Sequence, residues 1–182
     1  MLSLDLSGAF DNVSHERLLW ILRNKGLPDW IIKFVQAFLT GRTTKIIIEG
    51  YESESIPTPT GIPQGSPLSP ILFLFFISEL LETFDDSQDT IALGFVDDTN
   101  LITWGNTAAE NCTRLNQAHD RCIAWAKRHG AKFALDKYQL IHFTRKRRVS
   151  SDLALIVNIQ GCEVKPEATL KILGVWVDSK LN

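Results

Sequence analysis

Two adjacent aspartates, Asp97 and Asp98, lie in the segment GFVDDTNLI between two apolar runs, residues 91–96 and 101–104. Short apolar runs on either side of a polar interruption predict two strands joined by a tight hairpin. Neighbouring carboxylates repel each other, and burying them is costly unless a cation or a basic partner offsets their charge. The pair therefore indicates a candidate metal site. The alternative is a solvated turn, because aspartate is common in turns.

Asp5 is a third carboxylate in an unusual place, between Leu4 and Leu6 in a start that alternates like a strand. It could cap the helix expected after Ser14, or its strand could lie beside the hairpin so that three carboxylates meet. Such a cluster holds two divalent ions about 4 Å apart in phosphoryl-transfer sites. Oxygen-only ligands favour hard cations such as Mg²⁺ over zinc. The spacing by itself leaves both alternatives open.

Four helices are expected around these acids. Ser14 can cap a helix that ends at Gly26, and helical spacing of apolar residues predicts a second helix over residues 28–39. Residues 67–84 predict a helix that is apolar almost all round and is therefore buried. Residues 107–130 begin with a capping box, end with basic residues and a glycine, and predict the fourth helix.

The remaining apolar runs alternate and predict strands, and a loop rich in proline and glycine spans residues 58–65. Besides the first strand and the hairpin, the expected strands cover residues 43–49, 53–56, 140–143, 153–157 and 170–177. Helices mixed with antiparallel hairpins predict an α+β fold, with an antiparallel sheet and helices packed on one face.

Composition indicates one ordinary domain rather than a membrane or secreted protein. The chain has 182 residues, 45% of them hydrophobic, and no run approaches the length of a bilayer span. No signal-peptide pattern opens it. Its three cysteines lack CxxC spacing, which indicates a reducing compartment and argues against a zinc site. We expect an intracellular protein without a membrane partner.

Charge is unevenly distributed along the chain. The net charge is −2, but residues 1–110 carry 6 basic and 15 acidic residues, whereas residues 111–182 carry 13 basic and 6 acidic ones. An acidic first part and a basic second part suit a metal site beside a polyanion track. The alternative is an uneven but functionally neutral surface.

Four segments occur in the order and spacing of the reverse transcriptase palm: LDLSGAFDNV, TPTGIPQGSPLSPILF, GFVDDTNLI and HGAKFALDKYQLIHF. The form GIPQGSPLSP resembles retrotransposons that lack long terminal repeats, and their group II intron relatives. The resemblance covers the whole chain. It implies a polymerase palm with a ferredoxin-like core, and an RNA-directed DNA polymerase that joins dNTPs to a DNA primer on an RNA template.

The resemblance also implies roles for the acids. Asp5, Asp97 and Asp98 match the catalytic carboxylates, and the backbone carbonyl of Leu6 matches a ligand of the second metal. Two Mg²⁺ ions are implied, with Mn²⁺ as an alternative. One would lower the pKa of the primer 3′-hydroxyl, and the other would hold the triphosphate and the departing pyrophosphate.

Other matched residues concern the nucleotide. Phe10 resembles the family's steric gate, which crowds a 2′-hydroxyl, although it could simply be a core residue. Gln64 and Gly65 resemble the segment that contacts the incoming nucleotide, where glycine lets the backbone approach closely. Lys137 resembles the late lysine proposed as general acid for pyrophosphate; its alternative is a solvated charge.

Two further matches concern the nucleic acid. The turn at Leu173 and Gly174 resembles the primer grip. The basic run at residues 145–148 could follow a phosphate backbone, serve as a nuclear address or be a solvated loop.

The chain also departs from the family pattern. Val96 stands where relatives commonly have alanine, and it would press near the primer terminus. Ala131 and the run at residues 134–136 differ from the usual residues before Lys137, which loosens the assignment of the general acid.

From the resemblance we expect residues 1–182 to form the palm only. The fingers, the thumb and the other polyprotein domains would be missing, and the isolated chain would be inactive. The alternatives are a non-catalytic nucleic-acid-binding remnant of a decayed element and, more remotely, a two-metal hydrolase. The nucleus is the expected location, with a mitochondrion as the alternative.

Overall fold

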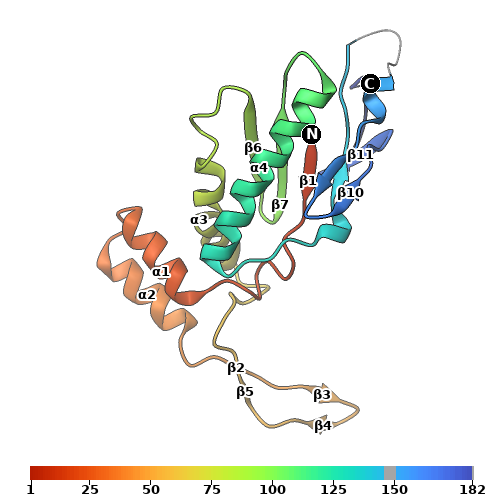
Figure 1. Cartoon of the computed structure of the whole chain (residues 1–182). Helices are drawn as coiled ribbons and strands as arrows, with labels where there is room; N and C mark the ends of the chain where they lie inside the picture. The colour runs from red at the N-terminus through yellow and green to blue at the C-terminus, as the bar shows by residue number, and fades with distance from the viewer. Residues whose placement is uncertain (146–150, 182) are drawn as a thin grey trace.

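The computed structural model describes residues 1–145 and 151–181, and a four-stranded antiparallel sheet forms its centre. The strands lie in the order β6 (Thr90–Phe95), β7 (Asp98–Thr103), β1 (Leu2–Leu4) and β8 (Gln139–Leu140) (Figure 1). Leu2 pairs with Leu101, which pairs with Ala92. Because side chains alternate along a strand, this register lines up apolar side chains on one face.

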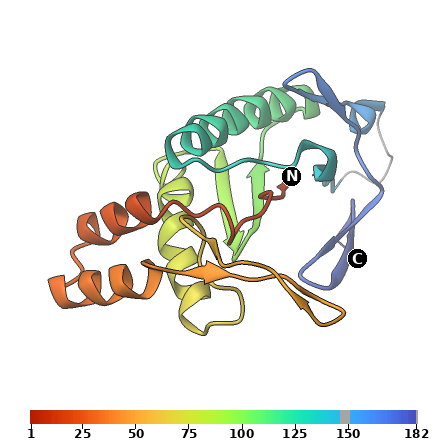
Figure 2. The ribbon, with the colours of Figure 1, turned by 90° about the horizontal axis from the view of Figure 1, so that it is seen from below.

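Two helices pack on that apolar face, α3 (Leu68–Glu82) and α4 (Ala108–His129). α3 contacts β6, and α4 contacts β6 and β7. Leu2 and Leu101 of the sheet share one buried cluster with Phe76 of α3 and Leu115 of α4. Seen from below, α4 lies along one side of the sheet (Figure 2). The expected α+β fold with helices on one face is confirmed.

The helix ends follow their capping residues. Thr107 Oγ1 accepts a hydrogen bond from the Glu110 amide at 3.1 Å, and Gly130 ends α4 in the left-handed region with φ 68°. Ser14 Oγ likewise accepts from the Arg17 amide at the start of α1 (His15–Asn24). A serine or threonine at such a position satisfies an amide that the helix itself leaves unpaired.

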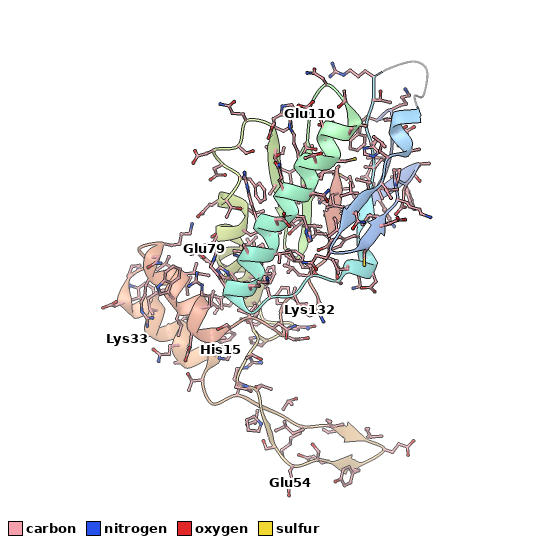
Figure 3. All side chains as sticks on the ribbon, in the orientation of Figure 1. His15, Lys33, Glu54, Glu79, Glu110 and Lys132 are labelled. Atoms are coloured by element: carbon pink, nitrogen blue, oxygen red, sulfur yellow. The ribbon has the colours of Figure 1, made fainter. Side chains whose placement is uncertain are left out.

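A partly buried network of polar side chains joins three helices. α1 packs on α2 (Asp29–Leu39) and on α3. Glu79 of α3 lies 3.3 Å from the Arg17 guanidinium on α1 and 2.8 Å from the His129 ring on α4. Figure 3 labels Glu79 where α3 passes behind α4. The network holds the α1–α2 pair against the helices that support the sheet.

Residues 43–57 form an arm that projects from the body (Figure 1), and Figure 3 labels Glu54 on it. Its strands are β2 (Thr43–Thr44), β3 (Ile47–Ile48), β4 (Tyr51–Glu52) and β5 (Ile56–Pro57), paired β2 with β5 and β3 with β4. The strand expected over 43–49 is split into β2 and β3, and of the strand expected over 53–56 only Ile56 lies in a strand, because β4 occupies the expected turn. All four strands are short and separate from the central sheet. Ile47 and Tyr51 are 71% and 72% exposed.

Two hairpins follow β8: β9 (Val157–Ile159) with β10 (Cys162–Val164), and β11 (Thr169–Ile172) with β12 (Val175–Asp178). Three further strand predictions need correction. The run at 140–143 is a strand only to Leu140. The run at 153–157 begins in the short 3₁₀ helix Ser151–Ala154, so its strand starts at Val157. The run at 170–177 is a hairpin, because the chain reverses at Leu173 and Gly174.

The prediction that α3 is buried almost all round is wrong on one side. Ile71 and Leu74 are 53% and 51% exposed, whereas Phe73 and Phe76 are buried. α3 packs on α1, α4 and β6, which leaves its opposite side uncovered in this chain. Within the described ranges, no helix combines the length and the apolar character that a membrane crossing requires.

Leu101 provides a test of the sheet–helix core. Leu101 is 0% exposed, and Leu93 on the paired strand is 51% exposed on the other face. We expect Leu101→Ala to lower the free energy of unfolding by about 2–5 kcal/mol, because it removes buried contacts and leaves a cavity. Urea unfolding measures the difference. Leu93→Ala is the matched control and should cost less than about 1 kcal/mol; similar losses for both variants would contradict the assigned faces.

Candidate active site

The candidate site lies where β1 ends and β7 begins. The last register pair of β1 and β7 joins Leu4 with Thr99, so the next residue of the first segment, Asp5, lies opposite Asp98. Asp5 is thus one residue beyond β1 rather than inside it. Asp98 opens β7, and Asp97 precedes it in the turn. Pairing across the sheet therefore brings the three carboxylates to one edge.

The turn that carries Asp97 is strained. Val96 has φ 55°, in the left-handed region that a β-branched residue rarely adopts. Such a conformation costs about 1–3 kcal/mol and persists only where the surroundings impose it. Here the pairing of Phe95 with Asp98 leaves only two residues, Val96 and Asp97, to reverse the chain.

A cavity of about 690 Å³ opens beside this turn. It is lined by Asp5, Leu6, Asp97 and Lys137 and also by the matched nucleotide residues Phe10, Gln64 and Gly65. The fold thus brings residues from distant parts of the sequence, such as Asp5 and Lys137, to the wall of one cavity.

A second cavity of about 250 Å³ lies on the other side of the same acids. Asp5, Asp98 and Lys137 line it together with Asn100 and Lys171. Asp5 and Lys137 therefore line both cavities, with Asp97 at the first and Asp98 at the second.

The proton affinity of Asp98 is raised by its surroundings. The pKa of Asp98 is raised, first by burial and then by the charges of Asp97 and Asp5. Lys137 Nζ lies 3.0 Å from Asp5 Oδ2, and this hydrogen bond is the largest cause of a raised pKa for Lys137. The lysine thus partly offsets a negative cluster whose members repel each other.

The donor set suits a hard divalent cation. Three carboxylates and the carbonyl of Leu6, a residue that lines the cavity, would offer oxygen ligands, and the pKa of Asp98 is raised first by burial and then by charges that a cation would offset. Within residues 1–145 and 151–181, however, no three acidic, histidine or cysteine side chains already stand close enough to enclose an ion. The predicted ligand roles of the acids stay predictions.

The wall of the larger cavity that Phe10 forms is built on packed aromatic rings. The Phe10 ring stacks on Phe73 with centroids 5.1 Å apart and planes 12° apart, so it is both a cavity wall and part of the core. The two alternatives for Phe10 are thus compatible. Gln64 and Gly65 are exposed on the loop before α3, and Gly65 has φ +89°, which favours glycine.

Two residues near the site were not predicted. Lys171 lines the smaller cavity, and its signal is a lone lysine between Leu170 and Ile172 in an apolar strand. Asp11 contacts Gln64, and its signal is its place directly after Phe10 in LDLSGAFDNV. In the basic run at 145–148, only Arg145 falls within the described residues, where it is exposed.

Asp98→Asn tests the crowding of the acids. A carboxylate whose pKa in the folded state is raised destabilises that state once ionised, so the wild type should lose stability as the pH rises from 3.8 through the raised value. At pH 7 the variant should be more stable, by less than about 1 kcal/mol because solvent screens an exposed charge. Urea unfolding from pH 3 to pH 7, with Asp86→Asn as control, measures this. If Asp98→Asn were less stable than the wild type at pH 7, the inferred destabilisation by the ionised Asp98 carboxylate would be contradicted.

Comparisons with known proteins agree with this architecture. The family model described as "Reverse transcriptase (RNA-dependent DNA polymerase)" matches residues 1–177. The RNA-directed DNA polymerase from mobile element jockey of Drosophila melanogaster is 28% identical over 98% of this chain and 19% of its own length. The Pol polyprotein of the type-2 retrotransposable element R2DM of the same species is 32% identical over 74% of the chain and 13% of its own length.

The fold also resembles solved structures. Telomerase from Candida tropicalis in complex with a fragment of telomeric RNA superposes with a TM-score of 0.65 at 12% identity, over 100% of this chain and 29% of that chain. At this identity the likeness concerns the fold alone. The resemblance to reverse transcriptases of retrotransposons without long terminal repeats is confirmed by the sequence relatives. With a family model that matches residues 1–177 of 182, this chain belongs to the reverse transcriptase (RNA-dependent DNA polymerase) family.

Proposed function

We propose that this chain is the palm of an RNA-directed DNA polymerase that extends a DNA primer on an RNA template with dNTPs. One observation carries the proposal. Asp5 and Asp97 line the same cavity as Phe10 and Gln64, and Asp98, opposite Asp5, lines the smaller cavity that Asp5 also lines. Carboxylates beside a space of nucleotide size are what nucleotidyl transfer requires. An intact set of three acids favours catalysis over a remnant that only binds nucleic acid.

The acids would hold the metal. Asp5, Asp97 and Asp98, with the Leu6 carbonyl, would bind two Mg²⁺ ions, and Mn²⁺ is the alternative. When bound, the cations would lower the pKa of the primer 3′-hydroxyl and neutralise the triphosphate and the pyrophosphate that leaves. In this structure the ammonium group of Lys137 contacts Asp5.

The aromatic wall would select the sugar. Stacking on Phe73 holds the Phe10 ring in place, so the ring cannot move aside for a 2′-hydroxyl, and deoxynucleotides would be favoured. Gly65 carries no side chain, and its backbone could approach the nucleotide closely. Gln64 would contact the nucleotide from the same loop.

Lys137 would act on the leaving group. A lysine amine is protonated at neutral pH and has a proton to give to pyrophosphate. The hydrogen bond to Asp5, which is the largest cause of the raised pKa of Lys137, would have to break before that transfer. The same contact keeps the amine at the edge of both cavities.

The whole activity would belong to a longer protein. The chain spans about 19% of the jockey relative and 13% of the R2DM relative. We propose that further segments of a retrotransposon polyprotein, the fingers and thumb among them, clamp the triphosphate and the primer. The nucleus is the proposed location, with a mitochondrion as the alternative.

A chimeric polymerase tests the proposed activity. The matching segment of the jockey polymerase is replaced with this chain, and primer extension on an RNA template is measured with Mg²⁺ and four dNTPs. We expect extension by the chimera and a loss of at least about 10²-fold in the Asp97→Asn variant, since an amide removes charge at the centre of the site. Asp86→Asn is the matched exposed control. Undiminished extension by Asp97→Asn would exclude Asp97 as a ligand.

Metal binding can be tested without activity. With residues 1–182, Mg²⁺ at ten times its dissociation constant should stabilise the folded state by about 1.4 kcal/mol, because only the folded state assembles the site. Thermal unfolding with and without Mg²⁺ measures the shift. Asp5→Asn and Asp98→Asn should each reduce it, whereas Asp86→Asn should not. A shift that survives both site substitutions would place the cation elsewhere.

A further inference from the structure

The loop that carries Gln64 is tied to the segment that follows Phe10. The amide of Ile62 donates to the Phe10 carbonyl, and the amide of Gly61 donates to the Val13 carbonyl, both at 2.8 Å. Gly61 has φ +81°, and a Cβ at that position would lie 2.7 Å from the Asp11 carbonyl oxygen. Only glycine permits this approach. The two segments therefore move as one unit beside the larger cavity.

The Gly61 carbonyl is held from two further elements. His15 Nε2 lies 2.7 Å from it at the start of α1, where Figure 3 labels His15, and Arg42 Nη1 donates to it at 3.1 Å from the base of the arm. Because a carbonyl only accepts, the His15 Nε2 must carry a hydrogen. The loop thus has a fixed position before any ligand binds.

Within this unit one side-chain contact reaches the cavity. Gln64 Nε2 donates to Asp11 Oδ1 at 3.0 Å. Gln64 lines the cavity, whereas Asp11 does not. An ionised carboxylate can only accept, so the contact dictates which end of the amide faces Asp11. The Gln64 Oε1 is then left as the acceptor directed away from Asp11.

We propose that Asp11 is a positioning residue for the nucleotide pocket. Its carboxylate selects one orientation of the Gln64 amide, so that the Oε1 acceptor meets a hydrogen-bond donor of the bound dNTP. The role of the dNTP as ligand rests on the proposed function. Asp11 itself touches no substrate and acts through Gln64.

The orientation can be measured without a ligand. In ¹⁵N-labelled residues 1–182, the side-chain NH₂ signals of Gln64, assigned with Gln64→Ala, report its hydrogen bond. We expect Asp11→Ala to move these signals to the position of a solvated amide, while Asp86→Asn leaves them unchanged. Unchanged Gln64 signals in Asp11→Ala would overturn the proposal, whatever the chain binds.

The consequence for the pocket is measured in the jockey chimera, which supplies the other polymerase segments: its complex with a primer and an RNA template is titrated with dTTP and Mg²⁺. Asp11→Ala should weaken binding about three- to tenfold, the usual effect of one lost hydrogen bond. Asp11→Asn keeps the volume but lets the amide adopt two orientations, and should weaken binding about twofold because half of the population is competent. Thermal unfolding of both variants excludes misfolding.

The outcomes separate the two claims. If the wild type binds dTTP and both Asp11 variants bind it equally well, the positioning role is overturned and the proposed function stands. If the chimera with the wild-type chain fails to bind dTTP although the Gln64 signals respond to Asp11, the nucleotide site itself is refuted and the positioning role falls with it. Graded loss of binding together with the altered amide signals supports the inference.

Discussion

The crowding of three carboxylates at one edge of the sheet is the constraint on which the site depends. Asp5 stands opposite Asp98, and Asp97 occupies the adjoining turn. Burial and the two neighbouring charges raise the pKa of Asp98, and Lys137 contacts Asp5 at 3.0 Å. Like charges in this arrangement cost stability unless cations offset them. The arrangement therefore costs the fold some stability, and a bound cation would offset that cost.

The rest of the structure supplies the stability that holds the acids in place. Leu2 and Leu101 pack beneath α3 and α4, so the strands that carry Asp5 and Asp98 cannot slip past each other. A slip of one residue would turn the apolar side chains to solvent and move the acids to different faces. Arg17, Glu79 and His129 then fix the helices relative to one another.

Two strained turns border the site. Val96 has φ 55° beside the larger cavity, and Leu173 has φ 47° in the turn that lines the smaller one. Neither residue is glycine, so each conformation is imposed by strand pairing on both sides of the turn. Val96 thus places a β-branched residue where the backbone conformation is least tolerant of one.

The helices and the central hairpin could be predicted from the sequence, because they depend on local information, whereas the candidate site residues came from the resemblance of four motifs to a family and their roles stay predictions. Hydrophobic spacing and capping residues located all four helices, and the four motifs selected Asp5, Asp97 and Asp98. Lengths of the outer strands, the exposed side of α3 and the projecting arm could not be predicted, since they depend on which surfaces other segments cover.

The contacts between distant residues were decided by the tertiary structure alone. Asp11 with Gln64, Lys137 with Asp5, and Lys171 beside Asp98 are pairs more than 50 residues apart in the chain. The spacing of apolar residues indicates the secondary structure and the burial of a segment. It does not indicate which side chain from a distant segment will contact it. The sequence by itself determined the elements and the chemistry of the acids, while strand register and loop packing decided which residues position them.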